Sequence, residues 1–300
     1  MNKTSVWRVM AVSLLCLGVL GLLASSGQAG TRIGFSVSTQ VNPFYKAMAY
    51  GVRDQAKAEG FEETILNAED KLEKQITDVE DLIQKKVEVI LINATHDGAA
   101  AVLNKADKAG IPVVTLQRGV PGAKVTSHIG TDNVVIGREG AEWVAKKLNG
   151  VGNVVVMEGI PGAASSEDRK KGSAEIWPKY PGIKIVAQQS GRYDRAVALQ
   201  VMENILQAQP KIDAVFCSND EMAMGVLAAV KAAKRSGIII TGMDANRDAR
   251  EAVGRGELTM TIALPPYEIG KTGVLHAKWI KTKERPVPPR TVMPVDFITK

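Results

Sequence analysis

Short runs of apolar residues alternate along most of the chain with segments in which apolar residues recur at helical spacing. Residues 33–37 have the pattern of a buried strand, and residues 44–58 have a helical pattern that ends at Gly60. Residues 87–92 are continuously apolar, which indicates a strand covered on both faces. Further strands are predicted at 63–66, 111–116, 153–157, 183–188, 214–217, 238–242, 258–263 and about 292–298, with an extended segment at 125–129. Further helices are predicted at 71–85, 98–109, 133–148, 166–177, 195–207, 221–233, 247–253 and 267–281. This alternation predicts an α/β fold with parallel sheets.

The pattern restarts after about residue 131, which predicts two doubly wound parallel-sheet lobes. The chain is expected to pass between the lobes near Thr131, near Leu264 and within residues 289–294. Three such segments form a hinge about which two lobes can close on a cleft. The predicted N-terminal lobe comprises residues 30–131 and 265–293, and the predicted C-terminal lobe comprises residues 132–264 and 294–300.

The first 29 residues have the pattern of a secretory signal peptide. Lys3 and Arg8 precede an apolar stretch at residues 9–23, and Gly27-Gln28-Ala29 is a small-x-small cleavage site. A membrane anchor would need roughly 20 apolar residues, more than this stretch provides. We therefore predict export to the periplasm, cleavage after Ala29 and no membrane insertion of the remaining chain.

Composition adds limits rather than a function. Apolar residues make up 45% of the chain and charged residues 23%, which is typical of a globular protein with ample core. The formal net charge of +6 is spread along the chain without a basic block, so nucleic acid is not a predicted partner. Cleavage after Ala29 would leave Cys217 as the one cysteine, which excludes an intramolecular disulfide.

Polar and aromatic residues follow the predicted strands where ligands bind in parallel sheets. The first such junction is VSTQVNPFY (37–45), in which Asn42 and Pro43 have the pattern of a helix start. It offers hydroxyls, an amide and two rings but no glycine-rich phosphate loop, which favours a neutral polyhydroxylated molecule over a nucleotide. The residues that follow the strands are Ser38, Asn42, Phe44, Tyr45, Asn93, Gln117, Arg118, Arg169, Tyr193, Asn219 and Asp244.

Each of these residues also has a structural interpretation. Asn42, Asn93, Asn219 and Asp244 could cap the helices that follow them, and Asp220 is predicted to be a cap alone. The arginines could make surface contacts, and the two rings of the first junction could belong to the core. The argument for a site is that all these residues fall at one edge. Their planar amide, guanidinium and carboxyl groups can pair with neighbouring hydroxyls, and their rings can pack on the C–H face of a sugar.

The sequence offers little for catalysis. Its histidines are His96, His128 and His276, and no two have metal-ligand spacing. There is no GxSxG motif, and Gly270-Lys271-Thr272 lies inside a predicted helix after two prolines rather than in a phosphate loop. We predict no enzymatic activity, no cofactor and no metal site.

The chain resembles the periplasmic sugar-binding proteins of ATP-binding cassette (ABC) importers, most closely their ribose-binding branch. The resemblance covers residues 32–300 and is carried by VSTQVNPFY, ILINAT (90–95), IPVVTLQR (111–118), SHIGTDN (127–133), FCSNDEMAMG (216–225), TGMDA (241–245) and MTIALPPYEIG (260–270). It implies a type I periplasmic binding protein fold. It also implies ligand contacts from Ser38, Asn42, Phe44, Tyr45, Asn93, Arg118, Arg169, Tyr193, Asn219 and Asp244, with Tyr45 and Tyr193 standing where that branch usually has phenylalanine.

Two positions depart from the pattern of the ribose-binding branch. Gln117 stands where those relatives have aspartate, and Leu264 stands where they have glutamine. A sugar hydroxyl that faces Leu264 would lose its partner, which costs roughly 1–3 kcal/mol, and about 1.4 kcal/mol is tenfold in affinity. We therefore expect a ligand that lacks a hydroxyl, or carries an apolar or carbonyl group, near these two residues.

The predicted function is capture of a monosaccharide or polyol and its delivery to an ABC permease in the inner membrane. A sugar acid or another small polar ligand is an alternative, as is a role in presenting the ligand to a membrane chemoreceptor. Regulators of the lac-repressor type share such a body, but they carry a DNA-binding helix-turn-helix where this chain has the predicted signal peptide.

Overall fold

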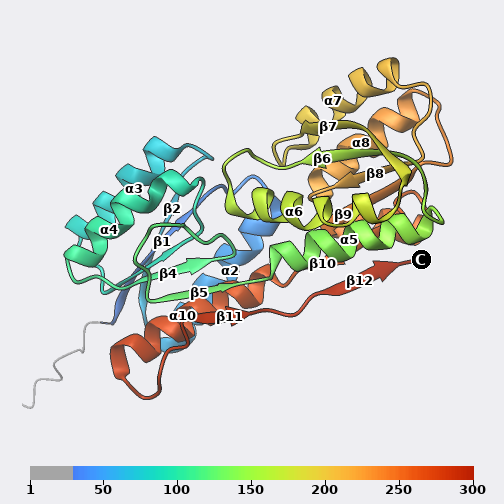
Figure 1. Cartoon of the computed structure of the whole chain (residues 1–300). Coiled ribbons are helices and arrows are strands. Elements are labelled where there is room, and N and C mark those ends of the chain that lie inside the picture. The colour runs from blue at the N-terminus through green and yellow to red at the C-terminus, as the bar shows by residue number, and fades with distance from the viewer. Residues whose placement is uncertain (1–29) are drawn as a thin grey trace, which may run out of the picture. The chain divides into compact units, whose positions relative to one another are not determined.

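The computed structural model describes residues 30–300, and Arg32–Lys300 form one compact unit. The predicted signal peptide, which ends at Ala29, lies outside the described residues. Within the compact unit the strands form two separate six-stranded sheets, each with helices on both faces (Figure 1). The predicted class, two doubly wound α/β lobes, is confirmed.

The N-terminal lobe contains the sheet with the strand order β11-β5-β4-β3-β1-β2, and all its neighbouring strands are parallel. Its strands are β1 (Arg32–Val37), β2 (Glu62–Asn67), β3 (Val89–Ile92), β4 (Val113–Leu116), β5 (Ser127–Gly130) and β11 (Arg290–Val292). Its helices are α2 (Pro43–Glu59), α3 (Leu72–Gln84), α4 (Ala100–Lys108) and α10 (Pro266–Thr282), with a 3₁₀ turn at Asp97–Ala99.

The C-terminal lobe contains the sheet with the order β12-β10-β9-β8-β6-β7. Its strands are β6 (Val151–Glu158), β7 (Gly182–Ser190), β8 (Ala214–Cys217), β9 (Ile239–Asp244), β10 (Met260–Ala263) and β12 (Asp296–Thr299), the last of which is antiparallel to β10. Its helices are α5 (Asn133–Lys147), α6 (Ala164–Ala174), α7 (Arg195–Ala208), α8 (Asp220–Ala232) and α9 (Arg247–Arg255), with a 3₁₀ turn at Trp177–Lys179.

Strand β3 shows why the central strands are continuously apolar. Its four residues are buried, and successive side chains point to opposite faces. Val89 and Leu91 belong to the core that α2 and α10 cover, whereas Ile90 and Ile92 belong to the core that α3 and α4 cover. Each face of the sheet therefore has its own apolar layer, as the sequence pattern predicted.

Pairs of helices pack backbone to backbone through glycines. A Cβ atom on Gly51 of α2 would lie 2.0 Å from the carbonyl oxygen of Tyr267 at the start of α10. A Cβ on Gly172 of α6 would lie 2.0 Å from the carbonyl oxygen of Val134 in α5. Such distances leave no room for a side chain. The contact between α5 and α6 matters for function because α6 carries side chains of the cleft.

The chain passes from one sheet to the other at three places: between β5 and α5, between β10 and α10, and between β11 and β12. The red segment of Figure 1 shows the last of these, with β11 beside the N-terminal sheet and β12 beside the C-terminal sheet. The prediction of one strand over 292–298 was therefore wrong. Pro294 interrupts the run, and a proline has no N–H to donate to a strand ladder.

A second prediction, that Asp220 serves only as a helix cap, was also wrong. Asn219 is the N-cap of α8, because its Oδ1 accepts a hydrogen bond from Met222 N at 2.9 Å. Asp220 lies in the first turn and is fully buried. Its carboxyl accepts hydrogen bonds from Thr261 Oγ1 at 2.6 Å and from Asn246 N at 2.7 Å, so it ties α8 to the segments after β9 and in β10.

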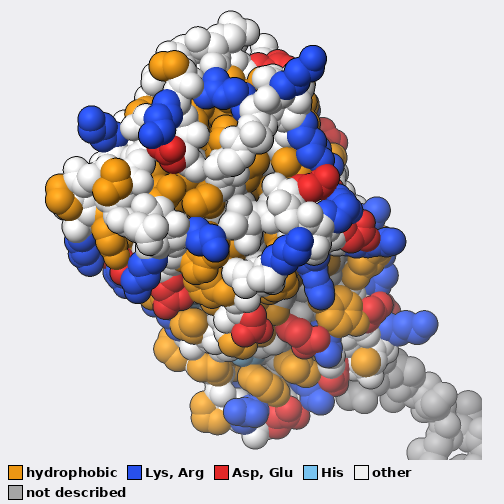
Figure 2. Space-filling view, turned by 90° about the vertical axis from the view of Figure 1, so that its right-hand side faces the viewer, with side chains coloured by type: hydrophobic (Ala, Val, Ile, Leu, Met, Phe, Trp, Pro, Cys, Tyr) orange, Lys and Arg blue, Asp and Glu red, His pale blue; other side chains and the backbone are white. Residues whose placement is uncertain are grey.

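The surface agrees with the absence of a basic block in the sequence. On the face that Figure 2 shows, Lys and Arg side chains are interspersed with acidic and neutral ones. Within residues 30–300, no helix is long and apolar enough to cross a bilayer.

Candidate functional site: the cleft between the lobes

The predicted site residues of the N-terminal lobe come from the ends of β1, β3 and β4 and from the start of α2. Asn42 is the N-cap of α2, and its Oδ1 accepts a hydrogen bond from Phe44 N at 2.9 Å. Since its Oδ1 is used in this way, the Nδ2 group has two N–H donors left for another partner. Phe44 and Tyr45 follow in the first turn, with their rings edge to face at 5.2 Å. The capping role and a binding role are therefore compatible at Asn42.

Arg118, just after β4, is the most connected side chain of the cleft, and it is almost fully buried. Its Nη1 donates to Ala94 O at 3.0 Å, and its Nη2 donates to the hydroxyl of Tyr45. Its guanidinium carbon lies 5.0 Å from the centre of the Tyr45 ring and 5.6 Å from that of Tyr193, which belongs to the other lobe. Arg118 thus stands between two aromatic rings, one from each lobe.

The C-terminal lobe supplies the opposite wall. Arg169 of α6 donates from Nε to Asn133 Oδ1 at 3.0 Å and from Nη1 to Ser218 O. Tyr193 follows β7. The guanidinium carbons of Arg118 and Arg169 lie 5.6 Å and 6.0 Å from the centre of its ring. Tyr193 has a φ of 57°, a left-handed conformation that is uncommon for a bulky residue and sets the direction of its ring. Asn219, the cap of α8, again keeps its Nδ2 group for a second partner.

Asp244, the last residue of β9, supplies a carboxyl group to the same wall and is buried. Burial raises the pKa of Asp244 well above its ordinary value, and the positive charge of Arg169 opposes that shift. Burial likewise raises the pKa of the Tyr45 phenol, with Arg118 acting in the opposite direction. Both groups therefore favour their protonated forms more than they would in water, and both can take part in hydrogen bonds to hydroxyls.

Eight predicted residues line one enclosed cavity between the lobes: Asn42, Phe44, Tyr45, Gln117, Arg169, Tyr193, Asn219 and Asp244. Arg118 lines the adjoining cavity at the mouth of the cleft together with Asp70 and Arg192. The enclosed cavity measures about 10 Å³, which is room for about one water molecule. The side chains that line the cavity therefore leave no room for a sugar between the walls in this arrangement.

Besides Arg118, three predicted residues do not line the enclosed cavity: Ser38, Asn93 and Leu264. Ser38 donates to Asn93 Oδ1 at 2.7 Å, and Asn93 Nδ2 donates to Leu116 O at 2.9 Å, so this pair joins the ends of β1, β3 and β4 behind the wall. Leu264 is buried in the segment between β10 and α10. A direct contact between these three residues and a ligand stays a prediction.

Sequence reasoning missed Ser165, which lines the enclosed cavity. Its Oγ accepts a hydrogen bond from Arg118 Nε at 3.3 Å and lies 3.2 Å from the hydroxyl of Tyr193. Ser165 precedes Arg169 by one helical turn, so the two share a face of α6. That spacing is a signal the sequence contained.

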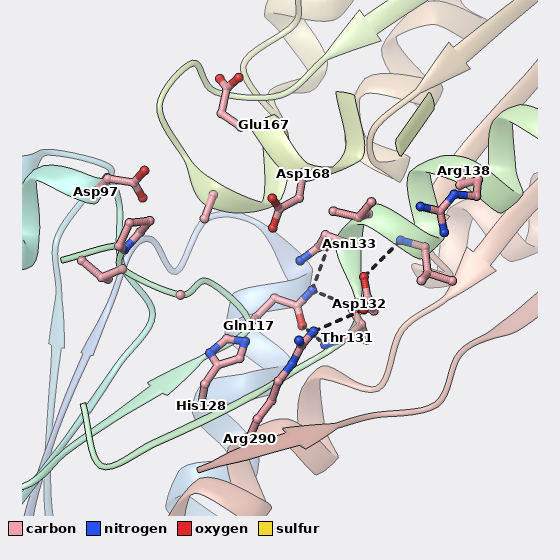
Figure 3. Close-up of a pocket in the computed structure, with 16 residues that line it drawn as sticks. Asp97, Gln117, His128, Thr131, Asp132, Asn133, Arg138, Glu167, Asp168 and Arg290 are labelled. Carbon is pink, nitrogen blue, oxygen red and sulfur yellow. Dashed lines mark hydrogen bonds and ion pairs between the residues drawn. The ribbon is translucent and has the colours of Figure 1, made fainter. Parts of the chain in front are cut away.

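A larger cavity lies beside the hinge rather than among the predicted residues. It measures about 800 Å³, and Figure 3 shows its lining, with His128 and Arg290 from one lobe and Asn133 and Asp168 from the other. Gln117 lines both this cavity and the enclosed cavity. The enclosed cavity is the candidate site, because there buried amide, guanidinium, carboxyl and aromatic groups of both lobes converge. Within residues 30–300, no group of three or more His, Cys, Asp and Glu side chains is placed to hold a metal ion.

Comparison with known proteins agrees with this architecture. A family model described as a periplasmic binding protein domain matches residues 33–282. The chain belongs to this family. It is 36% identical over 294 residues to the ribose import binding protein of Bacillus subtilis, covering 93% of this chain and 95% of that protein. It is 35% identical to the D-allose-binding periplasmic protein of Escherichia coli, covering 84% of this chain and 85% of that protein.

Among solved structures of the periplasmic binding protein family, one from Bacillus halodurans contains bound myo-inositol. It superimposes with a TM-score of 0.86 at 29% identity and covers 91% of this chain and 96% of that one. The predicted family, that of the sugar-binding proteins of ABC importers, is thereby confirmed. The relatives bind different sugars and a polyol, so family membership leaves the substrate of this periplasmic binding protein open.

Proposed function

We propose that this protein captures one monosaccharide or polyol molecule between its lobes and delivers it to an ABC permease. The observation that carries the proposal is the convergence of planar polar groups and aromatic rings from both lobes on one buried cavity. Amide and guanidinium groups offer donors, and the Asp244 carboxyl offers acceptors, so neighbouring hydroxyls of a sugar can be paired. The relatives named for ribose and D-allose and the structure with myo-inositol support this ligand class.

The size of the cavity adds a mechanical requirement. A cavity of about 10 Å³ does not hold a sugar, so ligand entry requires the lobes to separate or the Tyr193 ring to turn aside. A ligand that contacts both walls binds the closed arrangement of the lobes more tightly than the open one. It stabilises the closed arrangement by the difference between its binding free energies for the two. The permease would then recognise the ligand-bound arrangement.

The identity of the ligand is narrowed by Gln117 and Leu264. We propose a ribose-like pentose, a deoxysugar or a polyol that presents few hydroxyls to these two side chains. A sugar acid is the second candidate, because two buried guanidiniums, those of Arg118 and Arg169, face one buried carboxyl in the cleft. Delivery of the ligand to a chemoreceptor is compatible with the same binding step.

A thermal-shift screen of residues 30–300 tests the proposal. The panel contains D-ribose, D-allose, D-apiose, deoxysugars, myo-inositol, glycerol and sugar acids. A ligand at a hundred times its Kd stabilises a protein by about 2.7 kcal/mol, so a true ligand stands clear of the background. Asp244→Asn should reduce the shift, whereas Glu251→Gln, at an exposed position of α9, should retain it. If no sugar, polyol or sugar acid shifts the melting temperature, the ligand class is wrong.

A further inference from the structure

A continuous chain of hydrogen bonds joins the two walls of the cleft through the hinge. It begins at Gln117, whose Oε1 accepts from Thr131 N at 3.1 Å and whose Nε2 donates to Thr131 Oγ1 at 2.8 Å. Thr131 belongs to the segment between β5 and α5, where the chain passes from one lobe to the other. These two hydrogen bonds fix the orientation of the Gln117 amide and direct it towards the hinge.

The chain continues to Asn133, the first residue of α5, which is 5% exposed. Asn133 Oδ1 accepts from Arg169 Nε at 3.0 Å and, at 3.5 Å, from Gln117 Nε2. Figure 3 shows Gln117, Thr131 and Asn133 close together among the lining residues, with dashed lines from Gln117 to the other two. One carbonyl oxygen thus serves a donor from each lobe, and both donors belong to residues that line the enclosed cavity.

We propose that Asn133 is a positioning residue that sets the orientation of the Arg169 guanidinium and links that orientation to the closing of the lobes. The proposal rests on the proposed function only in that Arg169 is taken to contact the ligand. A guanidinium is planar, so a hydrogen bond that holds its Nε–H also fixes the directions of its other N–H groups. Because Gln117 moves with the other lobe and shares the acceptor, the geometry at Asn133 is complete only in the closed arrangement.

Two substitutions separate the acceptor from the rest of the side chain. Asn133→Asp keeps an acceptor oxygen at the same distance along the side chain, and a negative charge is favourable in the first turn of a helix. Asn133→Leu has a similar volume and no acceptor, so it leaves the buried Nε–H of Arg169 without its partner. Asn133→Ala is a second variant without an acceptor, for use if the leucine variant does not fold.

The first readout needs no ligand. The ¹H–¹⁵N signal of the Arg169 Nε–H, assigned by its loss in Arg169→Lys, should exchange slowly with solvent in the wild type and in Asn133→Asp. In Asn133→Leu it should shift and exchange at least about tenfold faster, because a buried donor has lost its acceptor. An unchanged signal in Asn133→Leu, or its equal loss in Asn133→Asp, overturns the proposal.

The second readout is the Kd for D-ribose, D-allose and myo-inositol, measured by calorimetry on the same proteins. For whichever of them the wild type binds, Asn133→Leu should weaken binding by about tenfold or more, and Asn133→Asp should stay within about threefold. Equal Kd values for the wild type and the leucine variant overturn the proposal. If the wild type binds none of the three, the proposed ligand class has failed for these probes, and the Arg169 signal alone decides the role of Asn133.

Discussion

The Nε–H of Arg118, in the N-terminal lobe, donates a hydrogen bond to Oγ of Ser165, in the C-terminal lobe, at 3.3 Å. Both side chains are buried, so water does not compete well for either group. The same oxygen lies 3.2 Å from the hydroxyl of Tyr193. Ser165 therefore contributes to closing the cleft as well as to lining it.

We expect Ser165→Ala to weaken the binding of whichever sugar gives the largest shift in the screen. The closed arrangement would then leave the Arg118 Nε–H unpaired, which costs about 1–3 kcal/mol, or roughly a tenfold to hundredfold increase in Kd. The melting temperature without ligand should change little. Ser173→Ala is the matched control, because Ser173 is also buried in α6 but bonds to Lys170 O within its own helix. Equal Kd values for the Ser165 variant and the wild type would contradict the prediction.

The backbone contact between α5 and α6 gives a prediction about stability. A methyl group on Gly172 would lie 2.0 Å from Val134 O, so Gly172→Ala must push the two helices apart. Overpacking of this kind typically costs about 1–3 kcal/mol. Because α6 carries Ser165 and Arg169, sugar binding should weaken as well. Urea unfolding curves, and the Kd for the sugar found in the screen, measure the two effects.

Gly254→Ala is the control for this substitution. Gly254 lies in α9, and nothing stands within 4 Å of its Cβ position. An exposed glycine in a helix is less favourable than alanine by up to about 1 kcal/mol, so this variant should be as stable as the wild type or more stable. If Gly172→Ala and Gly254→Ala have the same free energy of unfolding, the close contact between α5 and α6 does not destabilise the Gly172→Ala variant.

Most of the fold was predictable because periodicity and helix ends agreed. For α2, the cap Asn42, the first-turn proline and Gly60 at φ 68° all mark the boundaries found in the structure, Pro43–Glu59. Where two short elements lie close together, periodicity alone failed. The run of residues 292–298 overlaps the end of β11 and most of β12, which lie in different sheets, because the local pattern does not show which partner each strand pairs with.

The part of the candidate site that is formed by residues at the ends of strands was predictable from the sequence. Asn42, Asn219 and Asp244 come together at the cavity as expected from topology. The sequence could not show that the Gln117 amide is held by Thr131, because that depends on the φ of 62° at Gln117 and on the path of the hinge. Nor could it show that Ser38 and Asn93 bond to each other, because both have the residue types of ligand contacts.

The expected weak binding of ribose gives a prediction at two positions. The double variant Gln117→Asp, Leu264→Gln carries the residues of the ribose-binding branch, so it replaces the Gln117 amide by an acceptor-only carboxylate and gives position 264 the amide that leucine lacks. We expect it to bind D-ribose about tenfold more tightly than the wild type, since each unpaired buried hydroxyl costs roughly 1–3 kcal/mol. Calorimetry with D-ribose measures the difference. D-Ribose binding by the wild type that equals binding by the double variant would show that these positions did not change selectivity.

His276 gives a prediction about the pH dependence of stability. It lies in α10, 1% exposed, with Nδ1 3.0 Å from Ser127 Oγ. Burial lowers the pKa of His276 from 6.5 to about 4, and the positive charge of Arg285 acts in the same direction. The unfolded chain therefore takes up a proton near pH 6.5 that the folded chain refuses until about pH 4. The stability that depends on neutral His276 is fully present above pH 6.5 and is lost as the pH falls towards 4.

The difference in unfolding free energy between the wild type and His276→Asn isolates this effect, because other titrating groups cancel. It should shrink by about 3 kcal/mol between pH 7 and pH 4, since one pKa unit corresponds to about 1.4 kcal/mol. Asp220→Asn is the control of opposite sign. Burial raises the pKa of Asp220 to about 7, so its contribution to stability falls as the pH rises from about 4 to 7. Urea unfolding at both pH values measures these differences in unfolding free energy. If the difference between the wild type and His276→Asn does not vary with pH, His276 takes up its proton equally well in the folded and unfolded chains.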